Sequence, residues 1–246
     1  MGDSADLRDT IAVACRLLGH FGLARETTGH ISARTGAGRM LIRCRGKDEA
    51  GIVFTDAEVV REVDLDGQHL DGAGDYEKPS ELPIHGEILR ARPEVNAVVH
   101  CHPRASMVCT IAGLELKPIF GAFDPPATQL AIAGIPVFPR SITIRNKQLA
   151  DQMLDVMGDK SVLLMKGHGI VAVGRSVEEA TLNAIRLETL AAITLEVVKA
   201  GGTPMPIADE EIAHFRNLRE TVGAAEGKHG NWAWRHYVKL LEAEGR

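Results

Sequence analysis

The segment His100-Cys101-His102 holds the two side chains whose spacing most directly suggests chemistry. It follows the apolar run 97–99 and precedes Pro103, which is the pattern of a buried strand that a proline ends. Side chains alternate between the two faces of a strand, so His100 and His102 point the same way. Two adjacent imidazoles suit a metal ion, although two hydrogen-bonded histidines without metal would give the same pattern.

A catalytic metal needs three protein ligands and an open position, and His168 is the best third candidate. It lies between Gly167 and Gly169, where the backbone can approach a ligand closely, but alone it could equally be an exposed turn residue. His85 is its main rival. It follows Glu81 by four residues, so the two share a helical face and could hydrogen-bond each other or a substrate.

Glu81 is the candidate for proton transfer. A glutamate near a helix N-terminus is ordinarily a favourable partner of the helix dipole. If its carboxylate faces the metal site, the same residue becomes a candidate proton donor and acceptor.

The elements that must position these residues follow from the apolar pattern. Helices are predicted over 6–22, 80–92 and 176–199, the second with Ser80 as its N-cap and Pro83 in its first turn. Strands are predicted at 27–32 (a loop entering a strand), 40–44, 52–54, 63–65, 97–102, 135–138, 161–165 and 170–173. The last two form a hairpin around His168. Interleaved helices and hairpins predict one α/β domain over 1–246, with a largely antiparallel sheet covered by helices.

Composition excludes several classes of partner. The 246 residues carry a net charge of -5 with no basic block, and only 4% are aromatic, so neither nucleic acid nor a membrane surface is expected as a partner. The cysteines show no paired spacing and predict reduced thiols: Cys15, Cys44, Cys101 and Cys109. The polar N-terminus and the lack of a long apolar run predict a cytoplasmic protein.

Four segments together resemble the class II aldolase and adducin family. Segment 28–32 (Thr28-Gly29-His30-Ile31-Ser32) resembles the family's Gly-Asn-(Ile/Val)-Ser loop, and segment 79–81 resembles its Ser-Ser-Glu. Segment 92–102 resembles its Arg-Pro-Asp-x-x-Ala-Val-x-His-x-His, and segment 165–169 its third-ligand turn. Their order and separation also fit, and the resemblance covers about Leu7 to Lys199.

The resemblance implies that His100, His102 and His168 hold one divalent metal ion per subunit, with Glu81 as the catalytic acid/base. It also implies an αβα sandwich that assembles as a homotetramer with sites between neighbouring subunits. Zn²⁺ or Mn²⁺ is expected first, while Fe²⁺ and Co²⁺ also accept three histidines. Adducin-like relatives that lack the ligands are non-catalytic. All the ligands are kept here, which argues against a scaffold.

Three departures from the family fall on the sub-site that binds phosphate in its sugar-phosphate aldolases. His30 replaces the asparagine, Pro79 replaces the first serine, and segment 43–51 replaces a Thr-Pro-Thr-Gly-like turn. Arg43 and Arg45 would share one strand face, and arginine suits a planar carboxylate, although either could be a solvated surface residue. Together, these three departures resemble the sequences of the family's decarboxylases, which act on dihydroxyphthalate-like or pyridine dicarboxylates.

The sequence therefore predicts a metal-dependent decarboxylase of a hydroxylated aromatic or heteroaromatic carboxylate. His30 and Arg45, with Ser80, are expected to hold a substrate carboxylate. The full set of expected substrate-binding residues is Thr28, Gly29, His30, Ser32, Arg45 and Ser80. The alternatives are an aldolase for a hydroxy-acid or sugar-derived substrate, a dehydratase or epimerase, and a non-catalytic scaffold. Segment 231–237, which holds both tryptophans, is expected to pack on the core or a neighbouring subunit, or else to cover an aromatic pocket.

Overall fold

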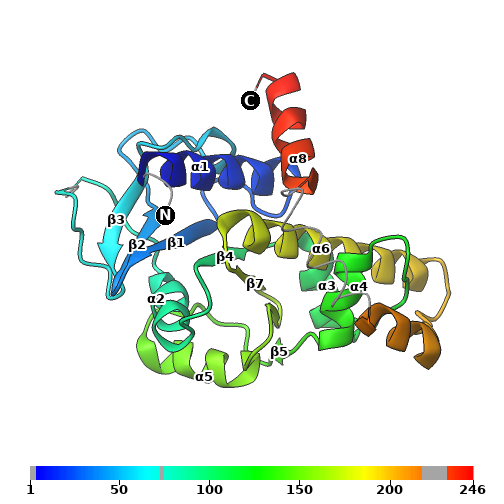
Figure 1. The fold of residues 1–246 in the computed structure, drawn as a ribbon. Helices are drawn as coiled ribbons and strands as arrows, with labels where there is room; N and C mark the ends of the chain where they lie inside the picture. Colours follow the sequence, from blue (N-terminus) through cyan, green and yellow to red (C-terminus); the bar gives the residue numbers. More distant parts are fainter. Residues whose placement is uncertain (1–3, 73–74, 218–231, 246) are drawn as a thin grey trace.

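A seven-stranded sheet in the order β3-β2-β1-β4-β7-β6-β5 lies at the centre of the molecule (Figure 1). The computed structural model describes residues 4–72, 75–217 and 232–245. The strands are β1 (His30–Gly36), β2 (Arg39–Arg43), β3 (Val60–Asp64), β4 (Ala97–Cys101), β5 (Val137–Phe138), β6 (Val162–Met165) and β7 (Gly169–Gly174). Among the strands of the described residues, only β5 and β6 pair in parallel, so the predicted, largely antiparallel sheet is confirmed.

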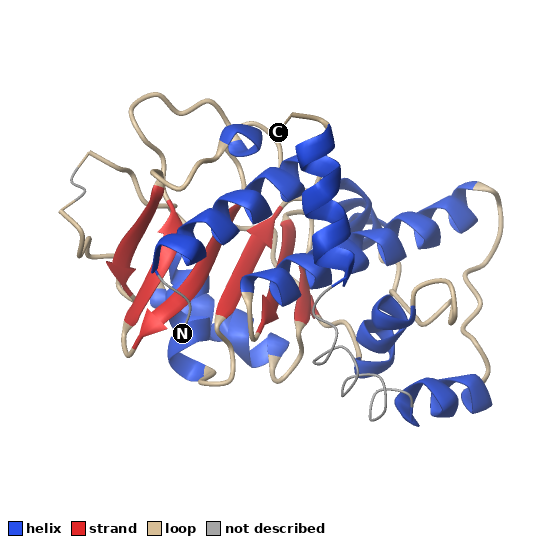
Figure 2. Cartoon of the chain, turned by 45° about the horizontal axis from the view of Figure 1, so that its top comes forward, coloured by secondary structure: helices blue, strands red, loops and turns tan. Residues whose placement is uncertain are grey.

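Helices cover both faces of this sheet (Figure 2). One face carries α1 (Ser4–His20), α3 (Arg104–Ala112), α4 (Pro125–Ala133) and α6 (Val177–Lys199), and the other carries α2 (Leu82–Ala91) and α5 (Lys147–Met157). The alternation of side chains along each strand separates two apolar cores: Val99 packs with α1 and α6, while Val98 packs with α2 and α5. This arrangement is the expected αβα sandwich.

The segment Ile52–Phe54 is a 3₁₀ helix (η1), not the predicted strand. Gly51 precedes it with φ of 106°, a conformation that favours glycine, and a Cβ there would lie 2.9 Å from the carbonyl oxygen of Glu26. Val53 then packs against Gly19 of α1, where a methyl group would lie 2.3 Å from its side chain. Three apolar residues could not distinguish these two outcomes, because a run this short has no period.

Helix α2 also begins differently from the prediction. Its N-cap is Glu81 instead of Ser80, and the Glu81 side chain makes no capping hydrogen bond. Pro83 lies in the first turn as expected. The consequence matters for the site, because the Glu81 carboxylate is left free to point away from its own helix.

The C-terminal helix α8 (Trp232–Ala243) packs on α1, with the rings of Phe21 and Tyr237 4.8 Å apart. This contact confirms the expected packing on the core, while Asn231 lies outside the described residues. Within the described ranges, the helices are too short or too polar to cross a bilayer.

Candidate metal centre

Four side chains form a cluster in which their ligand atoms, one from each residue, lie within 4.8 Å of one another. They are Glu81, His100, His102 and His168. His100 lies near the end of strand β4 and His102 directly follows it, and this strand lies between β1 and β7. His168 lies in the tight turn between β6 and β7, and Glu81 begins α2. The fold thus brings together the three predicted ligands and the predicted acid/base.

The orientation of His100 is fixed by the neighbouring strand. Its Nδ1 lies 2.9 Å from the carbonyl oxygen of Ile170, so Nδ1 carries a proton and donates it there, and Nε2 faces the cluster. That Nε2 lies 3.1 Å from Nε2 of His102. Two such atoms at this distance need a proton or a cation between them.

The carboxylate of Glu81 lies on the same side of the cluster. Its Oε2 is 3.2 Å from Nε2 of His100 and 3.4 Å from Nε2 of His168, while its Oε1 accepts the backbone N–H of Ile144 at 2.8 Å. Burial raises the pKa of Glu81, but the two imidazoles outweigh it and hold the pKa well below its usual range. Glu81 is therefore ionised at neutral pH.

Glycines shape the turn that presents His168. A Cβ on Gly169 would lie 2.3 Å from the carbonyl oxygen of Cys101 and 2.7 Å from the His102 ring. Gly167 has φ of 59°, and its N–H donates to Oγ1 of Thr110 at 3.0 Å. Gly169 is thus required because the backbone of Cys101 and the His102 ring lie so close to it, and Gly167 because of its left-handed backbone conformation. Nδ1 of His168 is buried and has no hydrogen-bond partner among the described residues.

The donor set fits a divalent metal ion. An ion bound tetrahedrally at about 2.1 Å from each nitrogen separates its ligand atoms by roughly 3.4 Å, close to the 3.1 Å between the Nε2 atoms of His100 and His102. Burial, followed by the neighbouring His100 and His168, lowers the pKa of His102 to about 3. This imidazole is therefore neutral at physiological pH, as a metal ligand must be.

A second histidine pair lies beside the cluster. His30 is the register partner of His100 across β1 and β4, and the two ring centroids are 5.1 Å apart. Nδ1 of His30 lies 2.7 Å from Nε2 of His85, and Nδ1 of His85 lies 2.7 Å from Oγ of Ser32. Burial, followed by neighbouring histidines, lowers the pKa of His85 to about 3 and the pKa of His30 well below its ordinary value. Both rings are neutral.

These contacts decide between the alternatives for His85. It is fully buried and is not part of the ligand cluster, so His168 is the third histidine of that cluster. Glu81 and His85 share a helical face, but they do not pair: Glu81 turns to the cluster, and His85 turns to Ser32 and His30.

The other predicted substrate residues lie on segments that border the cluster. The backbone N–H of His102 donates to the carbonyl oxygen of Leu23, which ties the loop containing Thr28 and Gly29 to the cluster. Gly29 has φ of 84°, and a Cβ there would lie 2.7 Å from the Cβ of Ala24. Ser80 is exposed and directly precedes Glu81.

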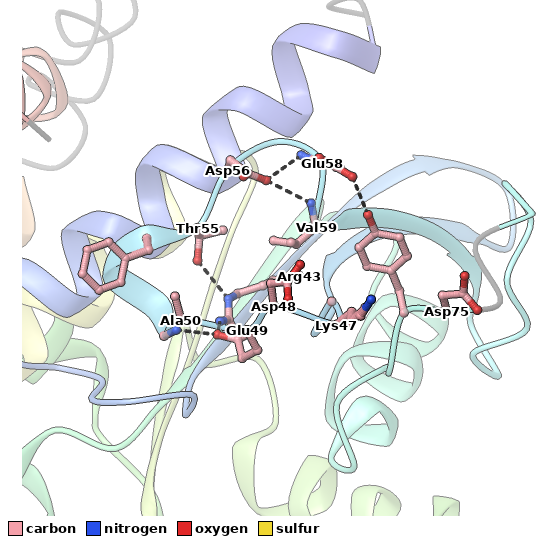
Figure 3. A pocket seen from close by; sticks show the side chains of 14 residues that line it. Arg43, Lys47, Asp48, Glu49, Ala50, Thr55, Asp56, Glu58, Val59 and Asp75 are labelled. Carbon is pink, nitrogen blue, oxygen red and sulfur yellow. Dashed lines mark hydrogen bonds and ion pairs between the residues drawn. The ribbon is translucent and has the colours of Figure 1, made fainter.

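The two arginines have different environments. Arg43 is buried against α1. Its guanidinium donates to Oε1 of Glu49 at 2.6 Å and to Oγ1 of Thr55 at 2.9 Å (Figure 3). Arg43 is therefore not a solvated surface residue, which was one of the two interpretations of the sequence. These residues form part of the wall of a pocket of about 350 Å³. Arg45 is half-buried, and its backbone pairs with Glu77. No hydrogen bond joins its side chain to the cluster in the described part of the chain.

Comparisons with known proteins agree with this site. The chain is 45% identical over 242 residues to the 3,4-dihydroxyphthalate decarboxylase of Arthrobacter keyseri, covering 97% of this chain and 95% of that protein. It is 38% identical over 241 residues to the 3,4-dihydroxyphthalate decarboxylase of Rhodococcus jostii, covering 96% of each. These relatives confirm the resemblance to the decarboxylase branch.

The fold and the family agree as well. An aldolase II superfamily protein from Pseudomonas syringae superposes with a TM-score of 0.82 at 24% identity, covering 100% of this chain and 95% of that one. The model of the Class II Aldolase and Adducin N-terminal domain matches residues 9–195. The chain therefore belongs to the class II aldolase and adducin family.

Proposed function

We propose that this protein is a divalent-metal-dependent decarboxylase of 3,4-dihydroxyphthalate or of a closely similar hydroxylated aromatic dicarboxylate. The observation that carries the proposal is the buried Glu81 carboxylate, which lies 3.2 Å and 3.4 Å from two of the three clustered imidazoles. The substrate class comes from the activity for which the relatives are named. The alternative is an aldolase that uses the same cluster.

His100, His102 and His168 would hold the metal ion, with Zn²⁺ or Mn²⁺ as the first expectation. A divalent ion bound there supplies a Lewis acid that stabilises negative charge on the substrate oxygens when the carbon–carbon bond breaks. One ion per subunit is proposed.

Glu81 would move the proton. Its pKa lies below the usual range, so it begins as a carboxylate and takes the proton from a substrate hydroxyl group. The bond from the ring carbon to the leaving carboxylate then breaks, carbon dioxide departs, and the electron pair stays on the ring. Glu81 returns the proton to that carbon, directly or through a water that it orients, so its carboxylate is regenerated, and the phenolate oxygen of the product takes up a proton from solvent.

The second carboxylate of the substrate would be held by residues that border the cluster. His30 lies beside the ligands, with its ring 5.1 Å from that of His100. Thr28, Gly29, Arg45 and Ser80 complete the proposed sub-site. Ser32 is fully buried beneath His85, so we place it in a supporting position within the same sub-site.

We further propose that the chain acts as one domain over 1–246 within a cytoplasmic homotetramer whose sites lie between neighbouring subunits. Light scattering of the purified protein measures the assembly. A monomer that is fully active would contradict the shared sites.

The function is tested with purified protein that has been stripped by a chelator and reloaded with Zn²⁺ or Mn²⁺. Release of carbon dioxide from 3,4-dihydroxyphthalate, lost on stripping and restored on reloading, is expected. A panel of hydroxy acids and sugar phosphates serves as the control. Aldehyde release from that panel, with no carbon dioxide from the dicarboxylate, would favour the aldolase.

A further inference from the structure

Ser32, His85 and His30 form a continuous hydrogen-bonded chain from the interior of the sheet to the metal cluster. Both links are 2.7 Å long, between Oγ of Ser32 and Nδ1 of His85 and between Nε2 of His85 and Nδ1 of His30. Ser32 and His85 are fully buried, while His30 is 7% exposed. The chain thus has one closed end and one end that reaches the site.

The direction of the chain is set at its closed end. Oγ of Ser32 has Nδ1 of His85 as its hydrogen-bond partner, and the strand neighbours of Ser32 are the apolar Ile42 and Val98. A buried hydroxyl hydrogen without an acceptor costs more than an oxygen with a spare lone pair. Ser32 therefore donates its hydrogen to His85.

The remaining hydrogens follow in order. Because Nδ1 of His85 accepts from Ser32, the neutral ring of His85 carries its hydrogen on Nε2 and donates it to Nδ1 of His30. Because Nδ1 of His30 accepts, the neutral ring of His30 carries its hydrogen on Nε2. This Nε2 is on the ring edge away from His85 and has no hydrogen-bond partner among the described residues.

We propose that Ser32 and His85 are positioning residues that hold His30 in its Nε2–H tautomer, so that His30 donates this hydrogen to the substrate carboxylate that is retained. The identity of the ligand rests on the proposed function, whereas the tautomer does not. The opposite tautomer would turn a lone pair toward the carboxylate and repel it. The buried pair thus determines whether the sub-site attracts or rejects a carboxylate.

The tautomer is tested directly by nitrogen NMR of the Zn²⁺-loaded protein labelled with ¹⁵N-histidine. Two-bond correlations from the ring carbon hydrogens distinguish a protonated from an unprotonated nitrogen, and the spectrum of His30→Asn assigns the His30 signals. A protonated Nε2 on His30 is expected, with a shift of its signal when phthalate is added as a non-hydroxylated probe. A protonated Nδ1 on His30, or no response to phthalate, would overturn the proposal.

Kinetics on 3,4-dihydroxyphthalate test the positioning role. Ser32→Ala is expected to mix the tautomers of His30 and to raise KM by about tenfold, the lower end of what one hydrogen bond to a charged group is worth, with little change in kcat. His85→Gln keeps a donor amide near the position of Nε2 and is expected to retain most of the activity. His85→Leu has no such donor and is expected to lose activity because its KM rises.

Thr194→Val is the matched control, because Thr194 is also a fully buried hydroxyl but donates within α6 to the carbonyl oxygen of Leu190. A similar KM change in this variant would identify a general loss of stability as the cause. If the protein releases no carbon dioxide at all, the proposed function fails, and the NMR result still decides the tautomer.

Discussion

The Nε2 atoms of His100 and His102 lie 3.1 Å apart, and the hydrogen bond from Nδ1 of His100 to Ile170 turns the Nε2 atom of that ring toward the cluster. Two lone pairs at this distance repel each other unless a proton or a metal ion lies between them. The metal ion is therefore expected to stabilise the folded chain as well as to serve catalysis.

Metal binding is expected to raise thermal stability. A ligand at a thousand times its Kd stabilises the native state by about 4 kcal/mol, so stripping the metal should lower the Tm by several degrees. His102→Ala should lose both the increase in Tm that the metal gives and the activity. His214→Ala removes an exposed histidine outside the cluster and should leave both unchanged. An unaltered Tm on stripping would contradict metal binding at this cluster.

Glu81→Gln is expected to keep the metal and lose turnover. The amide oxygen can still accept the backbone N–H of Ile144, but the side chain can no longer take a proton. Loss of a general acid/base costs about 10²- to 10⁴-fold in rate. Metal stoichiometry and carbon dioxide release are measured on the same preparation. If the metal is lost with the carboxylate, Glu81 is a ligand and its assigned role is wrong.

How much of this site the sequence could predict depends on the range of the interactions. The alternation of side chains along β4 was enough to place His100 beside His102, and the glycines around His168 indicated a tight turn. The contact of His85 with His30 spans 55 residues and depends on how α2 packs on β1. Similarly, no local pattern marked Ile144, whose backbone N–H reaches Glu81 from across the fold.

The prediction for Arg43 shows the same limit. The period-two rule was applied to Arg43 and Arg45, but β2 ends at Arg43 and Arg45 lies beyond it, in an isolated bridge with Glu77, so the two do not share a face of that strand. The rule also could not give the face on which α1 packs. That face carries Thr55 and Glu49, which bind Arg43 within the protein. Likewise, the start of α2 depended on the cluster, because Glu81 makes its hydrogen bonds there and leaves its own helix uncapped.

Gly169→Ala is expected to disturb the third-ligand turn. The added Cβ would lie 2.3 Å from the carbonyl oxygen of Cys101 and 2.7 Å from the His102 ring, so the turn must shift. A loss of roughly 2 kcal/mol or more in the free energy of unfolding and weaker metal binding should follow. Gly36→Ala is the control, because a Cβ there meets nothing within 4 Å. Urea unfolding and metal titration compare them, and equal effects would contradict the steric argument.

Buried thiols are expected to make the protein less stable at alkaline pH. Burial raises the pKa of Cys15 from about 9 to about 12, so in this range the unfolded chain loses a proton that the folded chain keeps. The contribution of the protonated Cys15 thiol to the free energy of unfolding is fully present below pH 9. Above pH 9 it falls by up to about 1.4 kcal/mol per pH unit toward pH 12. Urea unfolding across this range should show a shallower decline for Cys15→Ala. An unchanged slope would contradict the assignment.

Glu49→Gln is expected to destabilise the protein without weakening substrate binding. Arg43 is 2% exposed and depends on the Glu49 carboxylate at 2.6 Å, so removing that charge leaves a buried guanidinium uncompensated. Breaking one partner of such a pair costs about 3–5 kcal/mol. Asp48→Asn, an exposed neighbour on the same loop, is the control. Urea unfolding and KM are measured for both variants. A raised KM in Glu49→Gln at unchanged stability would instead make this ion pair part of the substrate site.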